Sequence, residues 1–280
     1  MSQLKVLTQY ILPKQALTAL AGMLAQAEAG KLTTAVIRWF VKRYQVNMSE
    51  AEQNDISHYK TFNEFFTRPL KAKARPIAKA DFICPVDGAI SQFGDINADQ
   101  IFQAKGHQYS TLAMLAGDQS LAEKFQDGHF ATLYLSPKDY HRIHMPCAAT
   151  LKSMTYVPGD LFSVNPLTAQ NVPGLFARNE RVICEFDSAN GTFALILVGA
   201  TIVGSMATTW HGVVNPPRVG RVTTWTYEDQ IISFKQGEEM GRFLLGSTVV
   251  MLFPKNTLKF NQAWAPAKAI QLGEKMATAL

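Results

Sequence analysis

The segment Leu245-Gly246-Ser247-Thr248 contains a peptide bond that could rearrange unaided. Gly246 has no Cβ, so it tolerates strained backbone angles and lets a nucleophile approach its carbonyl. The hydroxyl of Ser247 is only a few bonds from that carbonyl, and a base could activate it to convert the amide into an ester. Loss of the α-proton of Ser247 would then release the carboxylate of Gly246, and hydrolysis would leave a pyruvoyl group. Gly-Ser-Thr is, however, also an ordinary turn sequence.

A second polar cluster runs from Ser136 to Pro146 and holds His141 and His144, three residues apart. This spacing places them on one face of a helix or turn. Three interpretations are open: a structural pair, a metal site and acid–base catalysis. The last is open because histidine titrates near neutral pH. A metal would need a third ligand at a characteristic spacing, and none is present, so no metal is expected. Asp87, in Pro85-Val86-Asp87-Gly88, is another candidate, although Asp-Gly turns are usually structural.

The composition is that of an ordinary globular protein, with 280 residues, 47% hydrophobic and 18% charged. The net charge is +5, and the first 50 residues carry +4 of it, from six Lys/Arg against Glu28 and Glu50. Such a basic leader suits an anionic surface, either membrane or nucleic acid. The three cysteines are odd in number and lack CxxC spacing, which fits a reducing compartment. No secretory signal is visible, and the apolar run at 17–25 is too short to span a bilayer.

Helices are predicted in the leader, at 13–30, 33–44 and 56–66. On the second, Val36, Ile37, Phe40, Val41 and Tyr44 form an apolar stripe with Lys and Arg opposite. This pattern fits either an interfacial membrane helix or a helix docked on the protein's own core. Alanine-rich sequence after Asn261 suggests further helix.

Between these regions the sequence predicts strands rich in Val, Ile, Thr and aromatic residues, separated by turn residues. The clearest hairpin signal is Asp187-Ser188-Ala189-Asn190-Gly191. We therefore expect an α+β protein, with a β-rich catalytic domain of mixed or antiparallel sheets at 67–280 after a helical membrane-binding region at 1–66. The predicted strands lie at 82–93, 129–135, 150–157, 181–186, 193–203, 222–227, 231–234 and 248–253.

Several motifs together resemble the pyruvoyl-dependent phosphatidylserine decarboxylase family, and the resemblance covers nearly the whole chain. The Leu-Gly-Ser-Thr segment resembles the family's self-cleavage site in its bacterial and mitochondrial form. Further resemblance lies in Phe62 to Leu70, Ala74-Arg75-Pro76-Ile77, Pro85 to Gly88 and Ser136 to Pro146.

The resemblance implies a role for each candidate residue. Asp87, His144 and Ser247 would form the self-processing triad, with His144 as the base and Asp87 holding its tautomer. His141 would serve decarboxylation by proton transfer, and Phe162 and Ser163 would line the substrate site. Cleavage at Gly246-Ser247 would give a β chain, 1–246, and an α chain, 247–280.

The implied function is conversion of phosphatidylserine to phosphatidylethanolamine and CO2 through a Schiff base with the pyruvoyl group made from Ser247, without pyridoxal phosphate. The implied location is peripheral, on the cytoplasmic face of the cell membrane. The implied partners are phosphatidylserine, the anionic membrane surface and the enzyme's own two chains, with further dimerisation left open and no nucleic acid. Two alternatives stay open: a pyruvoyl decarboxylase of a soluble amino acid, and a non-catalytic β-domain that binds anionic lipid.

Overall fold

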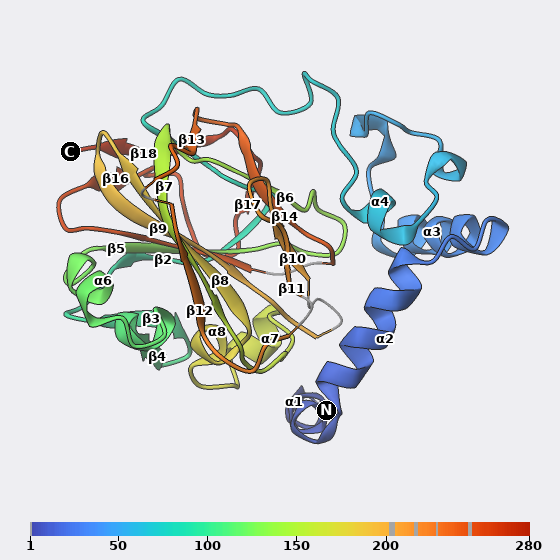
Figure 1. Cartoon of the computed structure of the whole chain (residues 1–280), viewed down its shortest axis with the longest axis horizontal. Helices are drawn as coiled ribbons and strands as arrows, with labels where there is room; N and C mark the ends of the chain where they lie inside the picture. Colours follow the sequence, from blue (N-terminus) through green and yellow to red (C-terminus); the bar gives the residue numbers. More distant parts are fainter. Residues whose placement is uncertain (1, 202–204, 216–217, 228, 246–247) are drawn as a thin grey trace.

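The computed structural model describes residues 2–201, 205–215, 218–227, 229–245 and 248–280, with side chains from residue 7 onward in these ranges. A helical leader lies along one side of a body of antiparallel β-sheets (Figure 1), which confirms the predicted α+β class. The leader comprises α1 (Ser2–Ile11), α2 (Lys14–Gln26), α3 (Lys31–Tyr44), the 3₁₀ helices η1 (Met48–Glu50) and η2 (Ile56–His58), and α4 (Phe62–Phe66).

The leader departs from the prediction in three places. Helix α1 was not predicted; α2 follows it directly after Pro13 and ends at Gln26, short of Gly30. The helix predicted at 56–66 is instead η2 followed by α4. A capping box separates them: the Thr61 hydroxyl accepts from the Glu64 amide, and the Glu64 carboxylate accepts from the Lys60 amide.

Helix α3 shows how the leader attaches to the body. Ile37 is completely buried against Phe65 and Phe66 of α4, so the predicted apolar stripe, apart from the exposed Val36, docks on the protein's own core. The opposite side of the leader is different, because its apolar side chains face outward. The exposed ones on α1, α2 and α3 include Leu7, Ile11, Leu17, Leu20, Met23, Leu24, Leu32, Val36 and Trp39.

The large sheet has nine strands in the order β12-β7-β8-β9-β15-β5-β2-β17, with β13 pairing β7 beside it. The predicted hairpin at 187–191 joins β8 and β9. The strands of the large sheet are β2 (Gly88–Asp95), β5 (His129–Tyr134), β7 (Ala149–Val157), β8 (Arg181–Ser188), β9 (Gly191–Val198), β12 (Thr223–Thr226), β13 (Ser233–Phe234), β15 (Thr248–Phe253) and β17 (Ala269–Ile270).

Three smaller sheets and four short helices complete the body. One smaller sheet consists of β1 (Phe82–Ile83), β18 (Lys275–Ala279) and β16 (Leu258–Phe260). A second consists of β11 (Gly212–Asn215), β10 (Met206–Thr208), β14 (Glu239–Phe243) and β6 (Arg142–His144). In the third, β3 (Gln100–Ala104) pairs with β4 (His107–Ser110). The helices are α5 (Thr111–Met114), α6 (Gln119–Lys124), α7 (Pro166–Ala169) and α8 (Leu175–Arg178).

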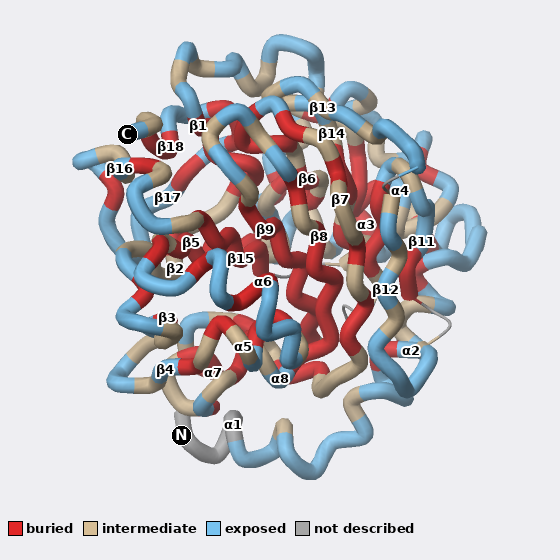
Figure 2. The backbone as a smooth tube through the Cα atoms, turned by 60° about the vertical axis from the view of Figure 1, so that its left-hand side comes forward, coloured by how far each residue is buried: buried red, intermediate tan, exposed pale blue. Residues whose placement is uncertain are grey.

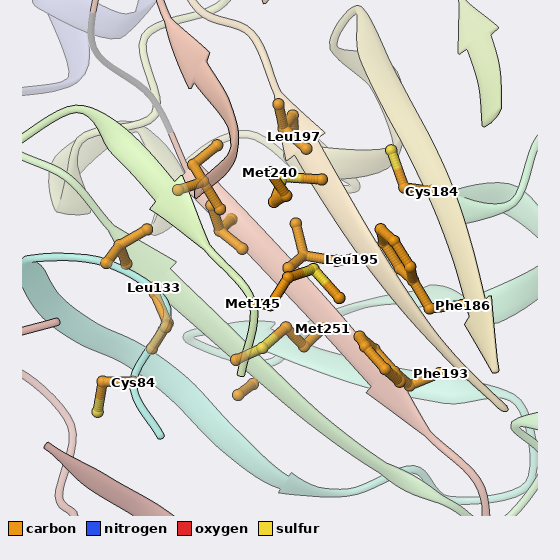
Figure 3. Close-up of a cluster of buried hydrophobic side chains, with 14 of the residues drawn as sticks. Cys84, Leu133, Met145, Cys184, Phe186, Phe193, Leu195, Leu197, Met240 and Met251 are labelled. Carbon is orange, nitrogen blue, oxygen red and sulfur yellow. The ribbon is translucent and has the colours of Figure 1, made fainter. Parts of the chain in front are cut away.

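Strand β15 lies in the middle of the large sheet, between β5 and β9, and all six of its residues are buried. Its side chains alternate between two cores. Val249, Met251 and Phe253 join the core drawn in Figure 3, whereas Val250 and Leu252 join the one beneath the short helices. Figure 2 shows these central strands as the buried part of the molecule, with α2 largely exposed.

The C-terminal tail corrects one expectation, because its alanines form strands rather than a helix. Ala269 of β17 pairs with Ala89 of β2, and Ala277 of β18 pairs with Phe82 of β1. Helix propensity is a weak preference, and here the free edges of two sheets determine the conformation.

Candidate active site

Thr248, the residue that follows Ser247 in the chain, lies at one end of the large sheet. Across the strands, Ala89 pairs with Tyr134, Tyr134 with Thr248, and Thr248 with Val198. Thr248 is the first residue of β15, so the bond between Gly246 and Ser247 comes just before this edge. Gly246 and Ser247 themselves lie outside the described residues.

The sheet end also explains the Asp-Gly turn. A Cβ at Gly88 would collide with the carbonyl oxygen of Tyr134 on the next strand, so glycine is required where β2 starts. Asp87 is thereby fixed at the same end, and only 6% of it is exposed.

The carboxylate of Asp87 is held by a cation. The Arg75 guanidinium donates from Nε to both oxygens, at 2.9 and 3.0 Å, and the backbone amide of Leu272 donates to Oδ1 at 2.9 Å. Arg75 also donates to Glu50 at 2.8 Å. The hydrogen bond to Asp87, above all, raises the pKa of Arg75. Through these hydrogen bonds Asp87 joins the segment before β2 to the C-terminal segment.

His144 is positioned by groups other than Asp87. Its Nδ1 lies 2.8 Å from the carbonyl oxygen of Gly237, and its Nε2 lies 3.1 Å from the hydroxyl of Tyr140. A carbonyl only accepts, so neutral His144 carries its proton on Nδ1, and Nε2 accepts from Tyr140. Burial lowers the pKa of His144, which keeps it neutral and basic at pH 7. The expected hydrogen bond with Asp87 is absent between these two described residues, and Gly237 fixes the tautomer instead.

His141 lies against the segment that leads to Gly246. Its carbonyl accepts from the amide of Phe243 at 3.0 Å, and its Nε2 donates to the carbonyl of Ser136 at 3.1 Å. Ser136 comes two residues after Tyr134, the partner of Thr248. His141 therefore bridges the strand ends on either side of residues 244–247.

The ring of His141 is completely buried and stacks on Phe66, with centroids 4.1 Å apart. Burial, aided by the charge of Arg68, lowers its pKa to about 3. Since Nε2 donates, Nδ1 carries the lone pair, and this buried atom has no hydrogen-bond partner among the described residues. The buried Oγ1 of Thr248 likewise has no hydrogen-bond partner among the described residues.

The two histidines do not share a helical face, contrary to the spacing argument. Residues 142–144 form β6, so the pair is split between a strand and the bend before it, with separate partners. No group of three His, Cys, Asp or Glu side chains suited to a metal occurs among the described residues.

A cavity of about 730 Å³ opens beside this sheet end. Asp87, Tyr134 and Tyr140 line it from the body, and Arg68 and Glu50 line it from the leader side. The cavity is large enough for a phospholipid headgroup.

Phe162 and Ser163 are not among the residues that line this cavity; the neighbouring Val164 and Pro166 are. Phe162 is 1% exposed, and Lys14 lies over its ring at 3.8 Å. The Ser163 amide donates to the side chain of Gln9 at 2.9 Å. These two residues therefore contact the leader around the end of α1. Any contact of Phe162 or Ser163 with substrate stays a prediction.

Sequence reasoning gave no role to three residues of the site, Tyr140, Arg75 and Arg68. Each lies inside a motif that carried the family resemblance, so the sequence did contain an indication that these residues belong to the site. Arg75 pairs with Glu50 and Asp87, and Arg68 donates to the carbonyl of Lys138. These partners are distant in the chain, so the contacts cannot be found from local spacing.

Comparison with known proteins gives a consistent result. A family model described as phosphatidylserine decarboxylase matches residues 62–278, and a second, described as PSD, matches residues 4–45. A phosphatidylserine decarboxylase proenzyme of Dechloromonas aromatica is 70% identical over 98% of this chain and 97% of its own. Proteins of the same name from Azoarcus and Albidiferax ferrireducens are 69% and 68% identical, again over 98% of this chain and 95% and 97% of their own.

Proposed function

Because the chain belongs to the phosphatidylserine decarboxylase family, we propose that it converts phosphatidylserine to phosphatidylethanolamine and CO2 after cutting itself between Gly246 and Ser247. The observation that carries this proposal is that Asp87 and the start of β15 lie at one sheet end, joined through Tyr134, beside a cavity that Asp87 and Tyr134 line. The proenzyme name of the relatives is consistent with self-cleavage.

In this proposal His144 removes the hydroxyl proton of Ser247, whose Oγ attacks the carbonyl of Gly246. The lowered pKa keeps His144 neutral, and its Nε2 lone pair, which accepts from the Tyr140 hydroxyl in this structure, becomes the proton acceptor when that hydroxyl moves aside. Asp87 acts by its negative charge, which stabilises the imidazolium that forms. Its expected orienting role passes to the carbonyl of Gly237.

Elimination of the α-proton of residue 247 releases the Gly246 carboxylate, and water then displaces ammonia to leave the pyruvoyl group. That group supplies the electron sink that decarboxylation of an amino acid requires. His141 moves the proton that replaces the lost carboxylate. For this it must first be protonated, and the two negative charges of the bound headgroup would raise its low pKa toward neutrality.

The test is an intact-mass spectrum of denatured protein, together with assay of CO2 release. We expect a fragment of residues 247–280 that is lighter than the unmodified peptide by the exchange of an amine for a keto oxygen, and CO2 release from phosphatidylserine vesicles. Release from free serine with none from phosphatidylserine would favour a soluble-substrate decarboxylase. An intact chain that remains inactive after addition of anionic lipid would contradict the proposal.

We also propose that the leader binds the cytoplasmic face of the cell membrane, as a peripheral domain at residues 1–66. The exposed apolar side chains of α1 to α3 and the basic charge of the leader support this location. None of the described helices is long and apolar enough to cross a bilayer.

A double substitution in the leader tests this location. Leu20→Glu with Leu24→Glu should weaken co-sedimentation with anionic vesicles by about 100-fold or more, since each exposed leucine can bury roughly 1.5–3 kcal/mol of apolar surface in lipid. Leu20 and Leu24 are 51% and 67% exposed, so the fold should tolerate the change. Ile231→Glu is the matched control, because Ile231 is 90% exposed on the body. Equal binding by all three proteins would contradict the proposed location.

A further inference from the structure

Arg68 is a buried cation without a carboxylate partner among the described residues. It follows α4 and lines the cavity beside Asp87, and only 3% of it is exposed. Its Nη2 donates to the carbonyl of Lys138 at 3.3 Å, its guanidinium lies 5.4 Å from the ring centroid of Phe65, and its Nε has no hydrogen-bond partner. Burial of a guanidinium costs free energy unless an anion compensates it.

The nearby carboxylates do not compensate it at close range. Arg75 holds both Glu50 and Asp87. Asp139 accepts from the amide of Ser136, and burial raises its pKa. Glu50, Asp87 and Asp139 attract the charge of Arg68 electrostatically, but only from beyond ion-pair distance. The guanidinium of Arg68, with its unpaired Nε–H, is therefore the cation that an anion entering the cavity would meet.

We infer that Arg68 binds the phosphodiester of the phospholipid headgroup, an inference that rests on the proposed function. A guanidinium matches the geometry of phosphate oxygens and stays charged. The substrate carries a second anion, its carboxylate, but a cation there would stabilise the charge that departs with CO2 and slow the reaction. The phosphodiester is unchanged in substrate, transition state and product, so binding it lowers KM without slowing decarboxylation.

The position of Arg68 also links the headgroup to His141. The charge of Arg68 contributes to the low pKa of His141, and Phe66 stacks on that ring from the same short segment. An anion on Arg68 would offset this effect and make His141 easier to protonate once substrate is bound.

The test compares Arg68→Met, which keeps an apolar stem, with Arg68→Lys, which also keeps the charge. Lys73→Met is the control, because it removes one exposed cation near the same segment. We expect Arg68→Met to raise KM for phosphatidylserine about 10–100-fold, with kcat within about threefold of wild type. Arg68→Lys should recover part of the affinity, and Lys73→Met should change neither constant. Unchanged KM in a folded, self-cut Arg68→Met protein would overturn the inference.

Competition experiments identify which anion is bound. Glycerophosphoethanolamine has the phosphodiester without the carboxylate, and serine has the carboxylate without the phosphodiester. Arg68→Met should lose inhibition by the first and keep inhibition by the second; the reverse result would move the contact to the carboxylate and overturn the inference.

A wild-type measurement covers the case in which Arg68→Met fails to fold or to cut. Glycerophosphoethanolamine should inhibit the wild type at least about tenfold more strongly than ethanolamine. Equal inhibition would mean that no cation in the cavity binds the phosphodiester, which overturns the inference. If instead the wild type releases no CO2 from phosphatidylserine, the proposed function itself fails.

Discussion

Ser247→Ala is expected to give a single uncut chain of 280 residues with no decarboxylase activity. Without Oγ, nothing can attack the carbonyl of Gly246, so neither the ester nor the pyruvoyl group forms. The loss should be complete rather than partial, because the missing atom is both the nucleophile for cutting and the precursor of the reactive group. Denaturing electrophoresis and intact mass would show the uncut chain, and CO2 release would show the loss of activity.

The matched control is Ser233→Ala, which removes an exposed hydroxyl from β13. It should be cut and should remain active. A Ser247→Ala protein cut at the same bond would contradict the scheme, because cleavage would then not need the hydroxyl. A cut Ser247→Ala protein with activity would contradict the pyruvoyl group as well.

Substitution of the two histidines should separate cutting from decarboxylation. His144→Ala is expected to slow cutting by roughly 10²–10⁴-fold, the range over which a general base contributes. His141→Ala should still cut, but its decarboxylation rate should fall by a similar factor, because His141 would move the proton that replaces CO2. Cutting is followed by mass against time, and decarboxylation is normalised to the cut fraction.

His129→Ala serves as the control for loss of an imidazole. His129 pairs with Asp95 at the far end of β5, away from Thr248. Full activity of cut His141→Ala would refute this division of roles. His141 is the more informative variant, since its carbonyl accepts from the amide of Phe243 at the end of β14.

Prediction from sequence worked best where the pattern was local and strong. Eight predicted strands overlap strands of the large sheet, and the hairpin lies where Asp187 to Gly191 predicted it. The strand predicted at 82–93 is divided between β1 and β2, and the one predicted at 193–203 ends as β9 at Val198, with 202–203 outside the described residues. Alternation of buried side chains along a strand is encoded in neighbouring residues, which is why it can be read directly.

Prediction was weaker where distant segments determine the structure. The alanines near the C-terminus form strands because β1 and β2 offer free edges, a condition that lies far away in the chain. The spacing of His141 and His144 suggested a shared face, yet pairing of β6 with β14 separates them. Likewise, Asp87 was matched with His144, but its nearest cation, Arg75, could not be predicted without the fold.

The place of β15 between β5 and β9 determines the order in which this protein could mature. All six residues of this doubly paired strand are buried, so we expect the sheet to assemble from the intact chain before the bond that precedes β15 is broken. After cleavage the small fragment would remain trapped by its neighbours, so maturation would run in one direction. Residues 1–246 and 247–280 expressed as two separate chains should therefore assemble poorly, even though the mature enzyme would itself consist of these two chains.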